Sequence, residues 1–160
     1  MKNHPIALAV LSSTLMLPAM SASAQEFASR AEAEIMLRRA VTMLKSDEKR
    51  ALDLFTSGHG GFMHKDLYVF CMGADGMLTA HPHFMGNSLK NWKDGTGKAV
   101  GREILTVAEE GKFAEVSYTA PRPQGLKASV VDPSMSKQAE KVSFVTKVGQ
   151  QTCGVGYYTK

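Results

Sequence analysis

The chain has 160 residues, of which 44% are hydrophobic and 21% are charged, and its formal net charge is +4. This length suits one domain with a single core, and we find no internal repeat and no low-complexity tract. The basic residues are spread along the chain rather than clustered and interleaved with aromatic residues, so the sequence does not indicate binding to nucleic acid.

The first 24 residues have the order of a cleavable secretion signal. Lys2 is followed by an apolar run over residues 6–17, and small residues lead up to Ala24. We therefore predict a signal peptide over residues 1–24, cleavage before Gln25, and one domain over residues 25–160 that is periplasmic or secreted. The alternative is a membrane anchor, but the apolar run is too short to span a bilayer and Pro18 follows it. No later segment predicts membrane insertion, and cleavage leaves 18 basic against 15 acidic residues, a net charge of +3.

Two helices are predicted next. Residues 26–44 are rich in Ala, Glu, Arg, Met and Leu, and apolar residues recur at spacings of three and four, which predicts a long amphipathic helix. The residues of this stripe are Phe27, Ala31, Ile35, Leu37, Ala40, Val41 and Leu44. A shorter helix is predicted over residues 47–56, with Ser46 as its N-cap, and the glycines that follow end the helical part.

Extended segments dominate from residue 66 onward. Residues 67–72 and 77–81 predict a β-hairpin, because β-branched and aromatic residues flank a turn over residues 74–76. A loop over residues 82–98 and a short helix over residues 102–110 follow. Three more strands are predicted over residues 113–119, 141–148 and 151–158, with a polar loop over residues 121–138. Helices followed by antiparallel strands predict an α+β fold, in which the long helix covers one face of a five-stranded sheet.

The two cysteines, Cys71 and Cys153, are predicted to form a disulfide, because paired thiols tend to oxidise outside the cytoplasm. They are too far apart for a CxxC metal or redox motif, and neither is followed by the His that attachment of c-type haem requires. The alternative is two buried free thiols.

Several short motifs in the extended half occur in a recognisable order. They are Leu67-Tyr68-Val69-Phe70, Asp75-Gly76, Ala80-His81-Pro82, Gly86-Asn87-Ser88-Leu89, Lys93-Asp94-Gly95-Thr96-Gly97-Lys98, Val116-Ser117-Tyr118 and Gly154-Val155-Gly156-Tyr157-Tyr158. Their number, order and spacing resemble the single Cache domain family of extracytoplasmic, PAS-like sensor modules, over residues 28–160.

The resemblance implies a ligand-binding domain without a cofactor, and not an enzyme. Members recognise small organic acids and similar metabolites in a pocket between the sheet and the loops that cover it. Most are joined to a membrane helix and a signalling output, neither of which this sequence shows. The resemblance therefore implies an exported domain that binds a small carboxylate and acts with a separate membrane sensor or receptor protein. Relatives often pair through the long N-terminal helix, so a homodimer is a further expectation.

Strand alternation assigns side chains to the two faces of the sheet. On the first strand, one face carries Leu67, Val69 and Cys71, and the other carries Tyr68, Phe70 and Met72. On the last strand, Cys153 shares a face with Val155 and Tyr157, opposite Gly154 and Gly156. The resemblance implies that these strands are neighbours, which allows the disulfide and places both glycines beside the aromatic residues. The glycines then leave room for a small ligand or, alternatively, only relieve crowding.

The candidate ligand-binding residues are Tyr68, Phe70, His81, Trp92, Asp94, Tyr118 and Lys141. Tyr118, Lys141 and His81 supply hydrogen-bond donors for an acidic metabolite, whereas Trp92 and Asp94 belong to the loop expected to close over the pocket. Each has a structural alternative. In the structural alternative, Lys141 is a solvated charge at a strand edge and Tyr118 is a core aromatic residue. His81 is then bonded to the backbone of the loop. Trp92 is then a loop anchor and Asp94 a turn residue.

A second functional hypothesis is metal handling through His59, His64, His81 and His83. Their spacing fits no tight metal-binding motif. A catalytic function is not indicated, because we find no convincing nucleophile and base pair, no HExxH and no phosphate-binding loop.

Overall fold

The computed structural model of the chain describes residues 27–122 and 137–159. The predicted signal peptide and most of the predicted polar loop over residues 121–138 lie outside the described residues. The elements are α1 (Arg30–Ser46), α2 (Glu48–Ser57), β1 (Met63–His64), β2 (Leu67–Met72), β3 (Leu78–Ala80), α3 (Val100–Val107), β4 (Ala114–Arg122), β5 (Lys137–Val148) and β6 (Gln151–Tyr158).

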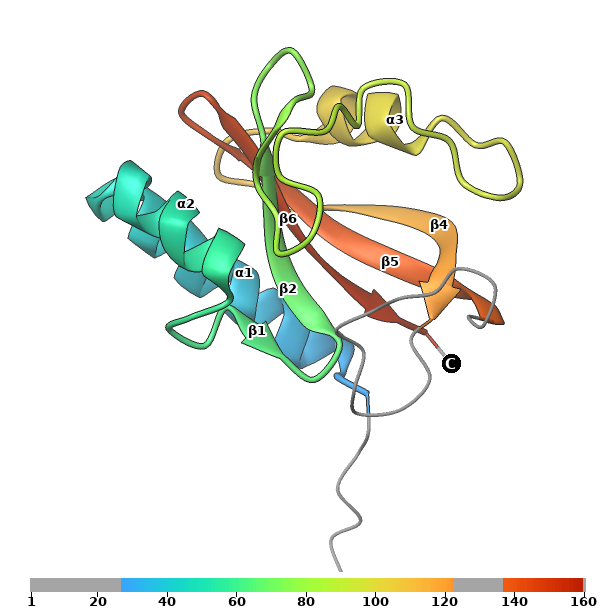
Figure 1. Cartoon of the computed structure of the whole chain (residues 1–160), viewed down its shortest axis with the longest axis horizontal. Helices are drawn as coiled ribbons and strands as arrows, with labels where there is room; N and C mark the ends of the chain where they lie inside the picture. The colour runs from blue at the N-terminus through green and yellow to red at the C-terminus, as the bar shows by residue number, and fades with distance from the viewer. Residues whose placement is uncertain (1–26, 123–136, 160) are drawn as a thin grey trace, which may run out of the picture.

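The strands form one antiparallel sheet in the order β1-β2-β6-β5-β4, and β3 also pairs with β2 (Figure 1). The predicted α+β fold is confirmed, and the predicted bounds of β2 and β6 match the structure. The sheet has six strands rather than five, because residues 63–64 pair with residues 67–68 in a very short hairpin. Two residues are too few to show a period of two in the sequence, so this strand was not expected.

Helix α1 begins at Arg30 because Ser29 caps it. The Ser29 hydroxyl accepts the Glu32 amide at 3.2 Å, and the Glu32 carboxylate accepts the Ser29 amide at 2.7 Å, which is a capping box. This start places the buried stripe on Ala33, Met36, Leu37, Ala40 and Leu44. The predicted stripe was partly wrong, since Ala31 is exposed and Ile35 is 58% exposed. The N-cap of α2 is Asp47 and not Ser46, which is the last residue of α1.

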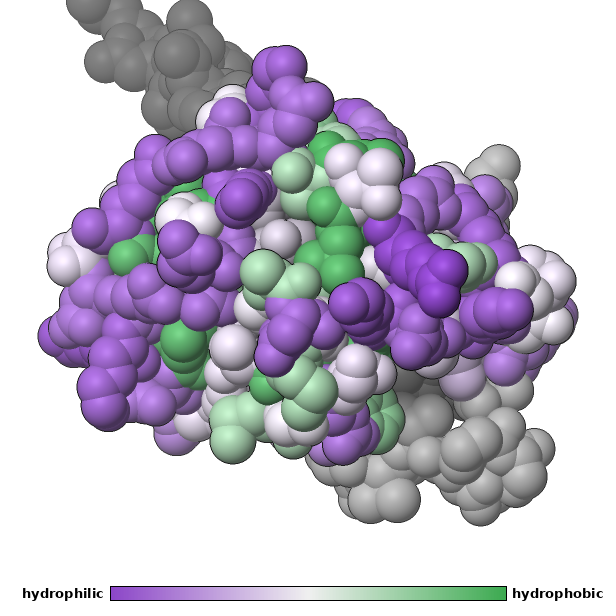
Figure 2. Space-filling model, turned by 90° about the horizontal axis from the view of Figure 1, so that it is seen from above, coloured by the Kyte–Doolittle hydropathy of each residue, from purple (hydrophilic) through white to green (hydrophobic). Residues whose placement is uncertain are grey.

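The sheet separates two hydrophobic clusters, and Figure 1 shows α1 and α2 on one face and α3 across the other. The cluster beneath α1 and α2 contains Leu67, Val69, Cys71, Cys153 and Val155. The opposite cluster contains Phe70, Met72, Val100, Ile104, Val116 and Val145. The faces predicted from strand alternation are therefore confirmed for β2. Seen from above, the surface is mostly hydrophilic and its apolar residues gather in the middle (Figure 2).

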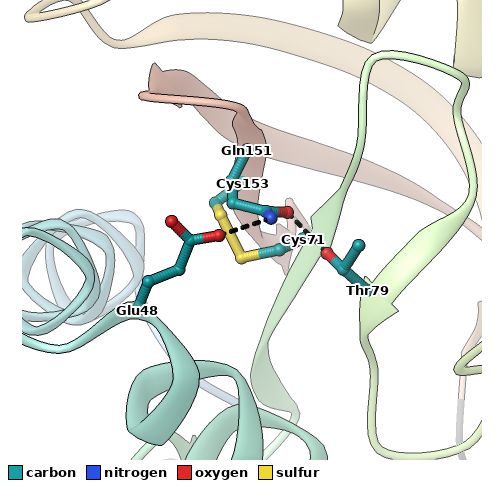
Figure 3. The surroundings of a disulfide bond; sticks show 5 residues. All are labelled: Glu48, Cys71, Thr79, Gln151 and Cys153. Atoms are coloured by element: carbon teal, nitrogen blue, oxygen red, sulfur yellow. Dashed lines mark hydrogen bonds between the residues drawn. A yellow bond between two sulfur atoms is a disulfide. The ribbon is translucent and has the colours of Figure 1, made fainter.

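The predicted disulfide between Cys71 and Cys153 is present. The two residues are direct partners in the β2–β6 pair, and both are fully buried. Gln151 lies close to the bridge, where its amide donates to the Glu48 carboxylate at 2.9 Å and accepts from the Thr79 hydroxyl at 2.6 Å (Figure 3). The bridge and this side chain together join β2, β3, β6 and α2 at one end of the sheet.

No helix in residues 27–122 or 137–159 is long and apolar enough to cross a membrane.

Candidate ligand-binding site

A pocket of about 640 Å³ lies on the face of the sheet opposite α1 and α2. It is bounded by side chains of β2, β4, β5 and β6 and by the segment that follows β3. Six of the seven candidate residues line it, namely Tyr68, Phe70, His81, Trp92, Tyr118 and Lys141. Asp94 does not. The pocket also includes lining residues that sequence reasoning did not select, among them Lys65, Asp66, Phe84, Leu89, Ile104 and Tyr158.

One row of side chains crosses three strands of the pocket. Tyr118 on β4 is the direct partner of Lys141 on β5, and Lys141 is the direct partner of Tyr158 on β6. Direct partners in an antiparallel sheet share a face, so a lysine lies between two tyrosines. The alternation that placed Gly154 and Gly156 on this face also places Tyr158 there, which is the signal that sequence reasoning missed.

Lys141 is buried, with an exposed fraction of only 3%, so it is not a solvated charge at a strand edge. Its Nζ lies 3.4 Å from the Tyr68 hydroxyl and 4.6 Å and 4.8 Å from the ring centroids of Tyr68 and Tyr158. Burial lowers the pKa of Lys141, but the surrounding phenol groups raise it by more, and the pKa lies above its ordinary value. Among the residues that the structure describes, no carboxylate oxygen lies within 4.0 Å of this ammonium group.

Tyr118 presents a neutral phenol to the same space. Its hydroxyl lies 2.9 Å from the Ser143 hydroxyl, and the Trp92 ring packs edge-on against it at a centroid distance of 5.5 Å. Burial raises the pKa of Tyr118, so the phenol keeps its proton at neutral pH. The Tyr158 hydroxyl instead donates to the Pro121 carbonyl, and burial raises the pKa of Tyr158 to about 12.

The two glycines of β6 make room for neighbouring side chains rather than for a ligand. A Cβ at Gly156 would lie 2.6 Å from the Ser143 Oγ and 2.7 Å from the Lys141 Cε. A Cβ at Gly154 would lie 2.6 Å from the Phe70 ring. The interpretation that these glycines leave an open space on the sheet was therefore wrong. They allow Lys141 and Phe70 to lie flat across β6, where both side chains shape the pocket.

His81 holds the segment after β3 in place. Its Nδ1 accepts the backbone N–H groups of His83 at 3.0 Å and Phe84 at 3.2 Å, and its ring lies 4.9 Å from that of Tyr68. Burial above all, and then the nearby charges of His83 and Lys141, lower the pKa of His81 to about 4. The imidazole is therefore neutral near pH 7, and these hydrogen bonds place its proton on Nε2.

Asp94 anchors the loop over residues 89–98 to the edge of β4. One carboxylate oxygen accepts the Thr119 amide at 3.0 Å, and the other accepts the amides of Thr96 and Lys98 at 2.9 and 3.0 Å. These hydrogen bonds, with that of Thr119 the strongest, hold the pKa of Asp94 far below its ordinary value. Lys98 adds a second link, because its ammonium donates to the Ser117 carbonyl at 2.6 Å. Asp94 is thus bonded to the protein backbone, away from the pocket.

The histidines do not assemble a metal site. Within the described ranges, no three side chains of His, Cys, Asp or Glu are placed to hold a metal ion. The His81 and His83 rings are 6.2 Å apart, and His64 lies 4.0 Å from the Glu32 carboxylate. The metal-handling hypothesis therefore finds no support in this arrangement.

The chain was compared with known proteins, and no curated protein matches it. The sequence profile described as Single Cache domain 2 matches residues 13–152, a range that begins within the predicted signal peptide. A methyl-accepting chemotaxis protein from Vibrio parahaemolyticus RIMD 2210633 superposes with a TM-score of 0.59 at 20% identity, covering 81% of this chain and 87% of that one.

Two further solved structures superpose with TM-scores of 0.56 at 18% identity, and each covers 81% of this chain. One is described as the periplasmic sensor domain of a chemotaxis protein, of which 90% is covered. The other structure, of which 88% is covered, is a Cache chemosensory domain described with the structural basis for its recognition of carboxylic acids. At these identities the superpositions establish the fold. The profile match spans most of the sequence, and the chain belongs to the single Cache domain family, whose members are sensor domains and generally not enzymes.

Proposed function

We propose that this domain is an exported sensor module that binds a small carboxylate, with Lys141 as the counter-charge. The observation that supports this proposal is the buried ammonium group of Lys141, which lies at a pocket lined in part by aromatic residues and has no carboxylate partner among the described residues. Burying a charge is unfavourable unless it is paired. A ligand carboxylate would supply the negative charge that Lys141 lacks. It would also accept hydrogen bonds from the Lys141 N–H groups that do not bond to Tyr68.

Tyr118 is proposed as a second donor to the ligand. Its hydroxyl and that of Ser143 carry two protons and share one hydrogen bond. When Ser143 donates to Tyr118, the Tyr118 proton is free to point toward a ligand beside Lys141, its direct partner across β4 and β5. One of the similar solved structures is a Cache domain that recognises carboxylic acids, and this similarity supports a carboxylate as the class of ligand.

Binding is tested by thermal shift and calorimetry on the exported protein, against carboxylates, amines, purines and divalent metals. A ligand that binds only the native state raises the melting temperature. We expect a rise with carboxylates. Lys141→Met should weaken carboxylate binding by at least about 30-fold, since removing one partner of a buried charge pair costs about 2 kcal/mol or more.

The matched control is Lys147→Met, because Lys147 lies on the same strand but is exposed. This variant should bind carboxylates as the original chain does. The proposal is overturned when metals or purines raise the melting temperature and carboxylates do not, or when Lys141→Met binds carboxylates normally.

Export is proposed on the signal-like order of residues 1–24. Cell fractionation followed by N-terminal sequencing should find the protein outside the cytoplasm and starting at Gln25. A full-length protein in the cytoplasm would contradict this. The partner protein and the homodimer through α1 stay predictions.

A further inference from the structure

We infer that the ligand is a monocarboxylate with an aromatic or branched apolar body, rather than a two- or three-carbon acid, a dicarboxylate or an α-amino acid. This inference rests on the proposed function and concerns the same pocket. It follows from the size of the pocket, the position of its apolar side chains and the number of its uncompensated charges.

The pocket is larger than a very small acid needs. Its 640 Å³ falls within the range of about 300–1,000 Å³ that is usual for ligands of drug size. A two- or three-carbon acid bound at Lys141 would leave most of this volume filled with water, so a larger body gains contacts that the smaller acids cannot make.

The apolar lining reaches from the interior of the pocket to its mouth. Trp92, Leu89 and Ile104 pack in the hydrophobic cluster between α3 and the sheet. Phe84 and Met63 also line the pocket, and they are 54% and 46% exposed. Large apolar side chains at a mouth stay in water unless a ligand covers them. An apolar body that extends from Lys141 toward the mouth would cover them, whereas a small acid would not reach.

Among the described lysines and arginines of the lining, Lys141 is the one without a carboxylate partner. The Lys65 ammonium is bonded to the Glu32 carboxylate at 2.7 Å, and the His81 imidazole is neutral near pH 7. The lining also contains the Asp66 carboxylate. A second carboxylate on the ligand would therefore be buried without a counter-charge and would share the pocket with a like charge. This arrangement favours a monocarboxylate over a dicarboxylate.

An α-amino acid meets a different obstacle. Its ammonium group is attached to the carbon next to the carboxylate, so binding at Lys141 would bring two positive charges together. Asp66 is the carboxylate among the described lining residues. Its Oδ1 accepts the Ala28 amide at 2.7 Å, and its Oδ2 has no hydrogen-bond partner among these residues but is closed off from solvent. The ligand ammonium would therefore lose water without gaining an anionic partner.

The test is calorimetry on the exported protein with propionate, 3-phenylpropionate, phenylalanine and succinate. 3-Phenylpropionate and phenylalanine share one carbon skeleton and differ in the ammonium group, so they form a matched pair. We expect 3-phenylpropionate to bind at least tenfold more tightly than each of the other three, since a buried phenyl group contributes the equivalent of several buried methylene groups. Lys141→Met should weaken this binding by at least about 30-fold, and Lys147→Met should not change it.

A second variant tests the position of the apolar body. Phe84→Ala should lower the ratio of 3-phenylpropionate affinity to propionate affinity by roughly fivefold, because the side chain at the mouth no longer packs on the phenyl group. An unchanged ratio would contradict the inference. So would tighter binding of propionate, succinate or phenylalanine than of 3-phenylpropionate. Binding of propionate alone, lost in Lys141→Met, would overturn this inference and leave the proposed function standing, whereas failure of all carboxylates would overturn both.

Discussion

Removal of the disulfide should destabilise the domain strongly. Cys71 and Cys153 are 82 residues apart in sequence. In the loop-entropy description, a bridge that closes a loop of this length restricts the unfolded chain by about 4.5 kcal/mol at 25 °C. One kcal/mol shifts the melting temperature of a domain of this size by roughly 3–4 °C, so reduction should lower it by about 15 °C.

The assay is chemical unfolding of the same protein with and without the bridge. Because both cysteines are fully buried, reduction is carried out in denaturant and the chain is refolded in the presence of reductant. Mass spectrometry after alkylation of the unfolded chain verifies two free thiols. The reduced protein keeps both sulfur atoms, so its loss of stability does not come from a cavity, whereas a Cys71→Ala and Cys153→Ala double variant adds that cavity. A free energy of unfolding that differs by less than about 1 kcal/mol between the oxidised and reduced forms would refute the reasoning.

Three further predictions concern the residues around the pocket. The pKa of His81 in the folded protein, about 4, is below its ordinary value of 6.5, so its contribution to stability is complete above pH 6.5 and is lost as the pH falls toward 4. Unfolding measured at pH 7 and pH 4.5 should show a loss on the order of 3 kcal/mol that His81→Asn does not show, and equal losses in both proteins would be the contrary result. Gly156→Ala should destabilise by about 1–3 kcal/mol and weaken carboxylate binding, because the new Cβ meets Ser143 and Lys141 at 2.6 and 2.7 Å. Gly95→Ala is its control, since the nearest atom there is 3.7 Å away, and equal effects of the two changes would contradict the account. Asp94→Ala should speed proteolytic cleavage within residues 89–98 and weaken binding without a direct ligand contact, and cleavage at the original rate would show that its hydrogen bonds do not hold the loop.

Local patterns predicted much of the fold, because the alternation of side chains along a strand is a property of the backbone. The period of two in β2 correctly separated Cys71 from Tyr68 and Phe70 and thereby indicated which face of this strand lines the pocket. The disulfide was predicted on other grounds, namely the two cysteines of a chain expected to be exported. Strand ends were harder to predict. β4 runs through Pro121 to Arg122, past the predicted end at residue 119, because an edge strand tolerates a residue that lacks an N–H group.

The set of residues that meet in the site could not be predicted from the pattern of any single strand, because it depends on how neighbouring strands are aligned. The Tyr118, Lys141 and Tyr158 row requires the register of two strand pairs, which the hydrophobic pattern alone does not specify when both faces of the sheet are buried. Lys141 was a candidate through the family resemblance. Its burial between the Tyr68 and Tyr158 rings was visible only once β6 was placed beside β5 and β2 beside β6.

The loop that carries Trp92 and Asp94 shows how two neighbouring candidates come to have separate roles. Both were expected to close over the ligand, yet Trp92 packs on Tyr118 inside the pocket while Asp94 binds the amide of Thr119, the next residue of β4. The cover of the pocket is therefore fixed to the same strand that carries a candidate ligand donor, and it is held by hydrogen bonds to backbone. A cover ordered in this way does not have to be ordered by a ligand, so the proposed binding at Lys141 would not have to offset the entropy cost of ordering this loop.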